Sequence, residues 1–123
     1  MANLLEKGSQ WLETMRTNHL ASPVTYRRGQ GQVTVNATLG KTDYETSDES
    51  GFTVKAHTND FLVIAVDLMI DDDLITPKVG DQIILTRNSR QAVFEVLALP
   101  SGECWRYSDP FGKTLRIHTK QVS

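Results

Sequence analysis

The chain has 123 residues, of which 39% are hydrophobic, and 13 Lys and Arg against 15 Asp and Glu give it a formal net charge of −2. A chain of this length buries one core but not two, so we expect a single domain over residues 1–123. The chain lacks the excess of basic over acidic residues that is typical of proteins that bind many phosphates, which argues against nucleic acid as a specific ligand.

Membrane insertion and secretion are not predicted. The longest apolar run, Phe61–Val66, is far shorter than the roughly 20 residues that span a bilayer. Residues 1–8 contain Glu6 and Lys7 and no apolar block, so we expect no secretory signal. Cys104 is the only cysteine, which excludes an internal disulfide and indicates a reducing compartment.

Residues 1–20 are predicted to form an amphipathic helix. Apolar residues recur there at steps of three and four between charged ones, and the helix should end before Pro23. Gly8 weakens such a helix, so we expect it to need a surface on which to pack. The residues expected to make that contact are Leu5, Trp11, Leu12 and Met15.

After Pro23, the spacing of the apolar residues changes from the 3.6-residue period of a helix to the two-residue period of a strand. In Val33–Leu39 every second residue is apolar, which predicts a half-buried strand, and Gly29–Gly31 should connect it to Val24–Arg28 as a hairpin. Residues 52–57 alternate in a third strand. The run Phe61–Val66 is apolar on both faces and is typical of a central strand.

A second group of strands follows a turn at Pro77–Asp81. Residues 82–87 and 90–99 should form a hairpin around Asn88-Ser89, and Trp105–Tyr107 and Thr114–Thr119 are the last two strands. Closely spaced strands with one terminal helix indicate a mainly β fold. We therefore predict a small antiparallel β-barrel or sandwich over residues 22–122, with one N-terminal amphipathic α-helix.

The stretch Gly40–Gly51 is the least core-like part of the chain. It is rich in charged residues, Ser and Thr, and Tyr44 is its only large apolar side chain. We predict a mobile loop with a functional role; a solvated hairpin tip without one is the alternative.

Metal sites find little support in the sequence. The histidines His19, His57 and His118 have no spacing typical of a metal site. His57 and His118 fall at polar positions of alternating strands, so we expect both to face solvent. Asp71-Asp72-Asp73 lacks the ligand pattern of a calcium loop, which favours a charged turn.

Catalysis is not indicated either. The Gly-x-Ser-x-Gly pattern is missing, Cys104 has no local catalytic signature, and Gly29-x-Gly31 does not continue into a dinucleotide loop. We therefore predict a protein that is not an enzyme and uses no cofactor and no metal. A small hydrolase remains a third hypothesis.

An oligonucleotide-binding barrel is a competing interpretation. Several basic residues could share one side of the sheet with Tyr26 and Tyr107, whose rings could stack on bases. The segment Trp105–Gly112 could either close one end of the barrel or form an interface. The basic residues concerned are Arg27, Arg28, Lys113, Arg116 and Lys120.

Three segments together resemble a known family. They are Pro23–Gly29, then Val33–Leu39 opening into Asp43-Tyr44-Glu45, and Trp105–Pro110 running into Thr114–Lys120. They are similar to small proteins of tailed phages and prophages, the head-tail joining (head-completion) proteins of the lambda FII type. The likeness covers nearly the whole chain.

This resemblance implies a structural virion protein. It implies a β-barrel subunit that assembles as a homo-oligomeric ring and catalyses no reaction. The ring would lie between the portal-side connector and the tail, and the subunit can be monomeric in isolation. It implies that the protein is located in the bacterial host cytoplasm during assembly and in the virion if the phage is functional. It implies no association with a membrane. The alternative is a stand-alone β-barrel binding module for a peptide or single-stranded nucleic acid. The residues expected at assembly contacts are Asp43, Tyr44, Glu45, Asp48, Glu49, Trp105 and Tyr107.

Overall fold

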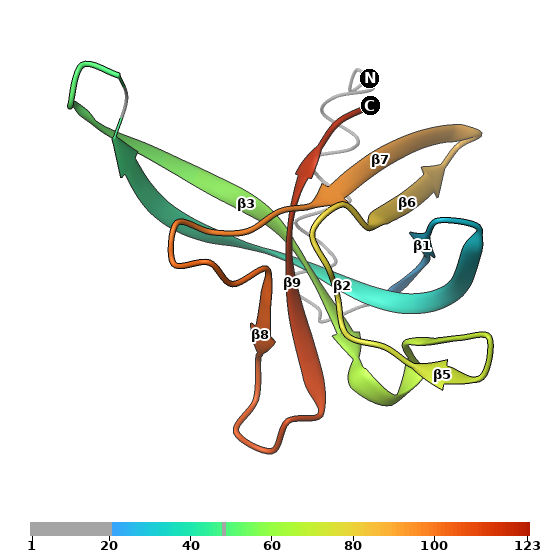
Figure 1. The fold of residues 1–123 in the computed structure, drawn as a ribbon. Helices are drawn as coiled ribbons and strands as arrows, with labels where there is room; N and C mark the ends of the chain where they lie inside the picture. The colour runs from blue at the N-terminus through green and yellow to red at the C-terminus, as the bar shows by residue number, and fades with distance from the viewer. Residues whose placement is uncertain (1–20, 48) are drawn as a thin grey trace.

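A computed structural model describes residues 21–47 and 49–123 of the chain (Figure 1). The predicted helix of residues 1–20 and its contacts through Trp11 lie outside the described residues, as does Asp48. The described part is mainly β. Its elements are β1 (Ser22–Arg28), β2 (Gly31–Ser47), β3 (Thr53–Ile64), the 3-10 helix η1 (Ala65–Asp67), β4 (Met69–Ile70), β5 (Asp73–Leu74), β6 (Gln82–Arg87), β7 (Arg90–Val96), β8 (Trp105–Tyr107) and β9 (Thr114–Gln121).

Six of these strands close into an antiparallel barrel. Their order is β3-β2-β1-β6-β7-β9, and β9 pairs with β3 to close the ring. β7 pairs with β9 at Thr119–Gln121, and β8 pairs with the earlier part of β9 at Leu115–Ile117. The prediction of a mainly β, antiparallel barrel is confirmed.

Tight turns set the register of both predicted hairpins. Gly29-Gln30 joins β1 to β2, and Gly29 has a φ of 59°, which glycine adopts at little cost. Asn88-Ser89 joins β6 to β7, with φ values of 51° and 64°. Two positive φ angles are the mark of a type I′ turn, whose twist matches that of the flanking strands. Both hairpins are confirmed, although β7 ends at Val96.

Alternating side chains fill the interior of the barrel. The rings of Phe61 and Phe94 meet edge to face with centroids 5.0 Å apart, a geometry that adds about 0.5–1.5 kcal/mol to the burial itself. The predicted inward positions of β2 are confirmed: Val35 and Ala37 are buried, and Val33 and Leu39 pack against the core. The other buried apolar residues are Val24, Tyr26, Val63, Leu68, Ile83, Leu85, Val96, Leu115 and Ile117.

The predicted loop over Gly40–Gly51 is wrong for most of its length. Gly40–Ser47 continue β2 and pair residue by residue with Thr53–Asp60 of β3. Polar and β-branched side chains are tolerated there because a two-stranded ribbon exposes both of its faces. The two predicted strands at residues 52–57 and 61–66 are accordingly one strand, β3, and Ala65 and Val66 belong to η1.

The two strand histidines differ in burial. His57 is exposed as predicted, whereas His118 is fully buried, so its predicted exposure is wrong. The alternation of β9 places His118 correctly on the face opposite to Ile117, but that face is not solvated at this position. The carboxylate of Asp60 pairs with the imidazole there and makes its burial tolerable.

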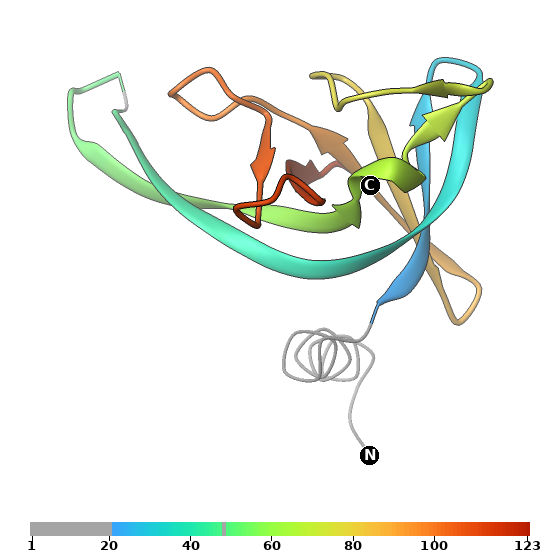
Figure 2. The same cartoon turned by 90° about the horizontal axis from the view of Figure 1, so that it is seen from below.

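Figure 2 shows the consequence of the long pairing between β2 and β3. The two strands continue beyond the barrel as a curved, two-stranded projection that ends far from β1 and from the β6–β7 hairpin. We call this projection the arm and define it as Thr42–Ser47 and Thr53–Thr58, which pair with each other.

Candidate functional site

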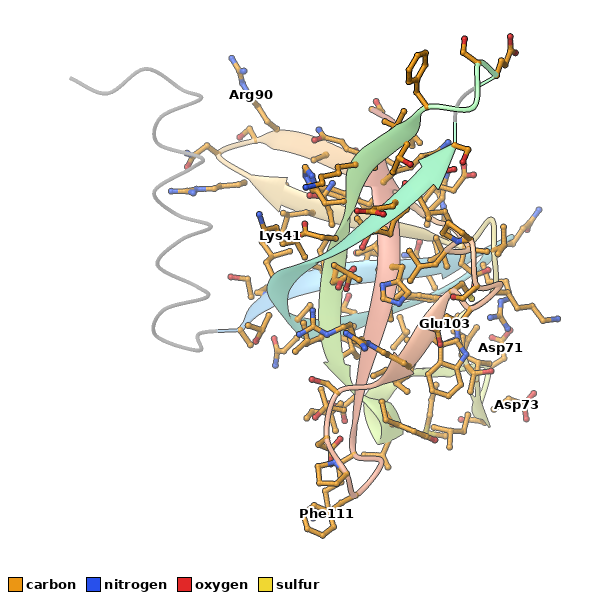
Figure 3. All side chains as sticks on the ribbon, turned by 90° about the vertical axis from the view of Figure 1, so that its left-hand side faces the viewer. Lys41, Asp71, Asp73, Arg90, Glu103 and Phe111 are labelled. Atoms are coloured by element: carbon orange, nitrogen blue, oxygen red, sulfur yellow. The ribbon has the colours of Figure 1, made fainter. Side chains whose placement is uncertain are left out.

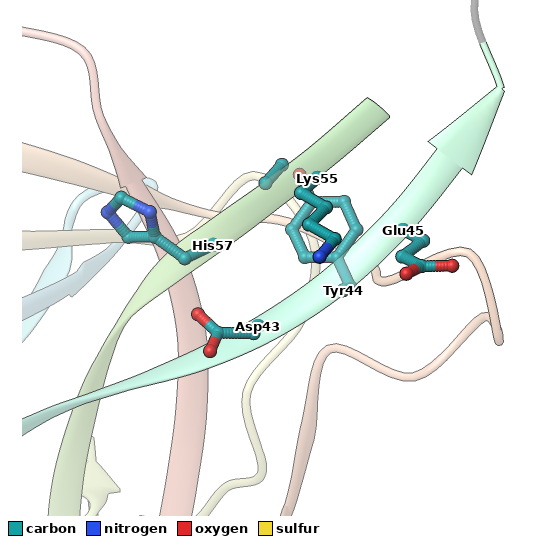
Figure 4. Close-up of a pocket in the computed structure, with 6 residues that line it drawn as sticks. Asp43, Tyr44, Glu45, Lys55 and His57 are labelled. Carbon is teal, nitrogen blue, oxygen red and sulfur yellow. The ribbon is translucent and has the colours of Figure 1, made fainter. Parts of the chain in front are cut away.

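The arm carries an open hollow with a volume of about 480 Å³ (Figure 4). Its lining comes from both strands. Asp43 lies opposite His57, and Glu45 lies opposite Lys55. Opposite residues of an antiparallel pair have Cβ atoms about 4.5–5.5 Å apart, so each acidic side chain has a basic or imidazole neighbour across the ribbon. The lining residues are Asp43, Tyr44, Glu45, Lys55, Ala56 and His57.

The hollow brings together three of the predicted site residues. Asp43 and Glu45 are exposed, and Tyr44 is half-buried. Glu49 is exposed in the turn at the end of the arm, and Asp48 lies outside the described residues. Sequence reasoning missed Lys55 and His57 as members of the same site, because the pairing of β2 with β3 that brings them here was hidden by the loop interpretation.

A buried carboxylate, Asp60, fixes the base of the arm. It accepts hydrogen bonds from the hydroxyls of Thr42 and Thr58, which form the first residue pair of the arm. It also accepts a hydrogen bond from Arg116 at 2.9 Å and lies 3.0 Å from Nδ1 of His118, both on β9. One carboxylate therefore connects both strands of the arm to a barrel strand.

Gly40 allows Arg116 to reach this carboxylate. A Cβ at Gly40 would lie 3.2 Å from Nη1 of Arg116, which is tighter than most contacts of a real Cβ. The same guanidinium nitrogen donates to the carbonyl oxygen of Lys41 at 3.4 Å. The guanidinium thus lies against β2 at Gly40 and Lys41, where glycine has no side chain in its way.

These contacts shift the titration of Asp60. Its burial would raise the pKa, but hydrogen bonds from His118, Thr42, Thr58 and Arg116 outweigh burial and lower the pKa from 3.8 to about 2. The carboxylate is therefore ionised at neutral pH, and its negative charge holds the base of the arm together.

The other predicted site residues, Trp105 and Tyr107, lie on β8 and not in the hollow. Their rings meet edge to face with centroids 5.1 Å apart. Trp105 packs against the core, whereas Tyr107 is 51% exposed, and its ring lies under Gly112. This aromatic pair supports the loop Ser108–Lys113, which we call the β8–β9 loop.

Asp109 shapes the β8–β9 loop. Its carboxylate accepts hydrogen bonds from the backbone N–H groups of Thr114 at 2.8 Å, Lys113 at 2.9 Å and Phe111 at 3.2 Å. These bonds, that from Thr114 foremost, lower the pKa of Asp109. The loop presents the side chain of Phe111, which is 81% exposed and stands at one extremity of the molecule (Figure 3).

Two of the five basic side chains expected in an oligonucleotide-binding groove are held in ion pairs. Arg28 is paired with Asp81 at 2.7 Å, and Arg116 with Asp60. Tyr26 is fully buried with its hydroxyl donating to Asp81, so its ring is not available to stack on a base. Of the residues named for single-strand binding, Tyr26 is therefore excluded as a stacking ring, and Arg28 and Arg116 already have acidic partners.

The described residues also bear on metal binding and on membrane insertion. No group of three His, Cys, Asp or Glu side chains there is arranged to hold a metal ion. Asp71 and Asp72 form the predicted charged turn, and Cys104 is half-buried. In the part of the chain that the structure describes, no helix is long and apolar enough to cross a bilayer.

Comparison with known protein families gives a match over nearly the whole chain. A family model described as phage head-tail joining protein matches residues 2–123. No curated protein matches the chain. The match covers the barrel, the arm and the β8–β9 loop together.

Proposed function

Because the chain belongs to the phage head-tail joining protein family, we propose that it works through protein contacts made by its arm at the junction of a phage head and tail. The family is one of structural phage proteins, and the arm is the feature of this chain best suited to such contacts. In this role the protein needs neither a cofactor nor a catalytic residue.

The observation that carries the proposal is the position of the arm outside the barrel core. Six residue pairs project beyond the closed sheet. Within residues 21–47 and 49–123, no other strand pairs with the outer edges of the arm. Exposed strand edges are sites where another chain can add a strand or dock, so natural proteins rarely leave them open without a use.

The base of the arm supports the same proposal. Hydrogen bonds of Asp60 to Thr42, Thr58 and Arg116 connect the base of the arm to β9. A contact element that is oriented before binding loses less entropy when its partner arrives. The arm can therefore be presented to a partner without help from the partner.

We propose further that the subunits assemble into a ring between the portal-side connector and the tail, in the host cytoplasm, and remain in the virion. The predicted site residues Asp43, Tyr44, Glu45 and Glu49 are the proposed contacts on the arm, and Asp48 is included from the sequence. Trp105 and Tyr107 are proposed to act through the β8–β9 loop that they support.

A shortened arm tests the proposal. Residues 43–57 are removed and Thr42 is joined to Thr58 by Asn-Gly, which keeps the hydrogen bonds of Asp60. Because the described residues among those removed are exposed or half-buried, the free energy of unfolding should change by only about 1 kcal/mol. The yield of joined heads and tails in a complementation assay should fall to background.

The matched control removes charge at another exposed turn. Asp71→Asn with Asp73→Asn leaves the arm intact and should join heads to tails at the normal yield. Normal joining by the folded, shortened protein would show that the arm is an idle extension and that the assembly surface lies elsewhere.

A further inference from the structure

Two exposed features lie at opposite ends of β3. The arm ends where β3 begins, at Thr53, and the β8–β9 loop leads into Thr114, which pairs with Ile64 at the other end of β3. A 12-residue strand is roughly 35–40 Å long. Figure 3 shows the same separation, with the arm and Phe111 at opposite extremities. The two features therefore cannot meet within one molecule.

The hollow on the arm is large enough for the ring of Phe111. Phe111 is the most exposed of the large apolar side chains in the described part, and hydrogen bonds to Asp109 hold its loop in place. The hollow on the arm measures about 480 Å³, and Tyr44 and Ala56 are among its lining. A cavity of about 150 Å³ already holds benzene, so the hollow has room for a phenyl ring.

Their charges are opposite in sign. The lining of the hollow holds two acidic residues and one lysine, a net charge of −1, and Glu49 in the turn at the end of the arm adds a further negative charge. Residues 106–113 contain Arg106, Lys113 and Asp109, a net charge of +1, and the carboxylate of Asp109 is occupied by backbone N–H groups. Arg106 and Lys113 are exposed, as are Asp43 and Glu45 at the hollow.

From this complementarity we infer that the hollow on the arm of one copy receives Phe111 from the β8–β9 loop of the next copy. Arg106 and Lys113 of that loop then lie near Asp43 and Glu45 of the arm. The inference rests on the proposed function, because it names a second copy of the chain as the partner of the arm.

Such a contact joins different surfaces of identical subunits. A head-to-tail contact of this kind repeats with every added copy and closes into a ring when the rotation per subunit divides a full turn. Burial of Phe111 supplies the apolar part of the contact, and the charges select the register. The arm and the β8–β9 loop become the two halves of one interface.

Charge exchange tests the contact in the full chain. Asp43→Lys with Glu45→Lys, and separately Arg106→Glu with Lys113→Glu, place like charges on both sides of the contact. Each pair should lower the yield of joined heads and tails by about tenfold or more. The variant with all four substitutions restores opposite charges and should regain most of the yield.

Cysteine pairs provide a second measurement that does not depend on the charge variants. In a Cys104→Ser background, Glu45→Cys with Phe111→Cys should give disulfide-linked copies when purified joined particles are treated with a mild oxidant that accepts the two electrons released by the thiols. The control pair is Glu45→Cys with Arg90→Cys, since Arg90 lies exposed at the β6–β7 turn and should give no link.

The outcomes separate the inference from the proposed function. The first outcome is that Asp43→Lys with Glu45→Lys lowers the joining yield, the fourfold variant does not restore it, and the Glu45→Cys with Phe111→Cys variant gives no disulfide between copies. This result would show that the arm binds a different protein. It overturns the inference and leaves the proposed function standing. Normal joining by the Asp43→Lys with Glu45→Lys variant and by the shortened arm would overturn both. Recovery together with the disulfide link supports the contact between copies.

Discussion

Asp60 shows how one buried charge can set the direction of a whole projection. Its carboxylate is fully buried, yet it accepts bonds from both strands of the arm and from Arg116. Removing one partner from a buried network leaves the other partners uncompensated, which costs more than the pair contributes when it is intact. The effect of a change at Asp60 should therefore be large.

We predict that Asp60→Asn lowers the free energy of unfolding by about 3–5 kcal/mol at pH 7. The amide retains the volume but loses the charge that faces Arg116 and His118. Urea denaturation followed by circular dichroism measures the loss. Asp43→Asn removes an exposed carboxylate from the arm and is the control, with an expected change within about 0.5 kcal/mol.

The effect of Asp60→Asn on the free energy of unfolding should depend on pH. The pKa of Asp60 is about 2 in the folded protein and near 3.8 when unfolded, so its ionisation stabilises the fold in full above about pH 5, and this stabilisation is lost as the pH falls through 3.8 and then through 2. A shift of this size corresponds to about 2–3 kcal/mol. The difference between wild type and Asp60→Asn should shrink by most of this amount between about pH 5 and pH 2. A constant difference would contradict the role assigned to the ionised carboxylate.

At the scale of single elements, the β6–β7 turn offers a stabilising change. Ser89 has a φ of 64°, a conformation that costs a residue with a side chain roughly 1 kcal/mol and glycine almost nothing. Asn-Gly is the preferred sequence for such a turn. Ser89→Gly should therefore raise the free energy of unfolding by about 0.5–1 kcal/mol, as measured by thermal and urea denaturation.

The control for this change is Ser101→Gly, because Ser101 does not have a positive φ. There the added chain entropy of glycine should lower stability slightly. An equal gain from both substitutions would mean that turn geometry is not the cause.

The elements that the sequence predicts well are those in which local chemistry decides the structure. Gly29-Gln30 and Asn88-Ser89 are turn sequences, and alternation in residues 33–39 identifies one face of β2 correctly. The strand pairing of Gly40–Ser47 was missed because its stability depends on β3, far along the chain, and not on its own apolar pattern.

Burial at the candidate site also depends on distant partners. His118 occupies a polar position in an alternating strand, and only its pairing with Asp60, 58 residues away, makes its burial acceptable. The sequence did point to Asp43, Tyr44 and Glu45. It could not indicate that Lys55 and His57 share their hollow, since cross-strand neighbours follow from register alone.

At the scale of the whole molecule, the barrel and the arm should differ in how readily they open. β9 pairs with β3 on one side and with β7 and β8 on the other, so its amides are released only when the barrel unfolds. The arm is a two-stranded ribbon with exposed and half-buried side chains, and it can open beyond Thr42 and Thr58 while the barrel remains closed.

We therefore predict that hydrogen exchange in the isolated protein is at least about a hundredfold faster in Asp43–Ser47 and Thr53–His57 than in β9, a difference of about 3 kcal/mol in opening free energy. In joined particles, a partner that covers the arm must suppress this opening, so exchange in the arm should slow while the β6–β7 turn remains unchanged. Mass-spectrometric exchange on both samples measures this. If the amides of the arm are already as protected from exchange as those of β9 in the isolated protein, the arm does not open separately from the barrel. A contact made on assembly then cannot act by suppressing such an opening.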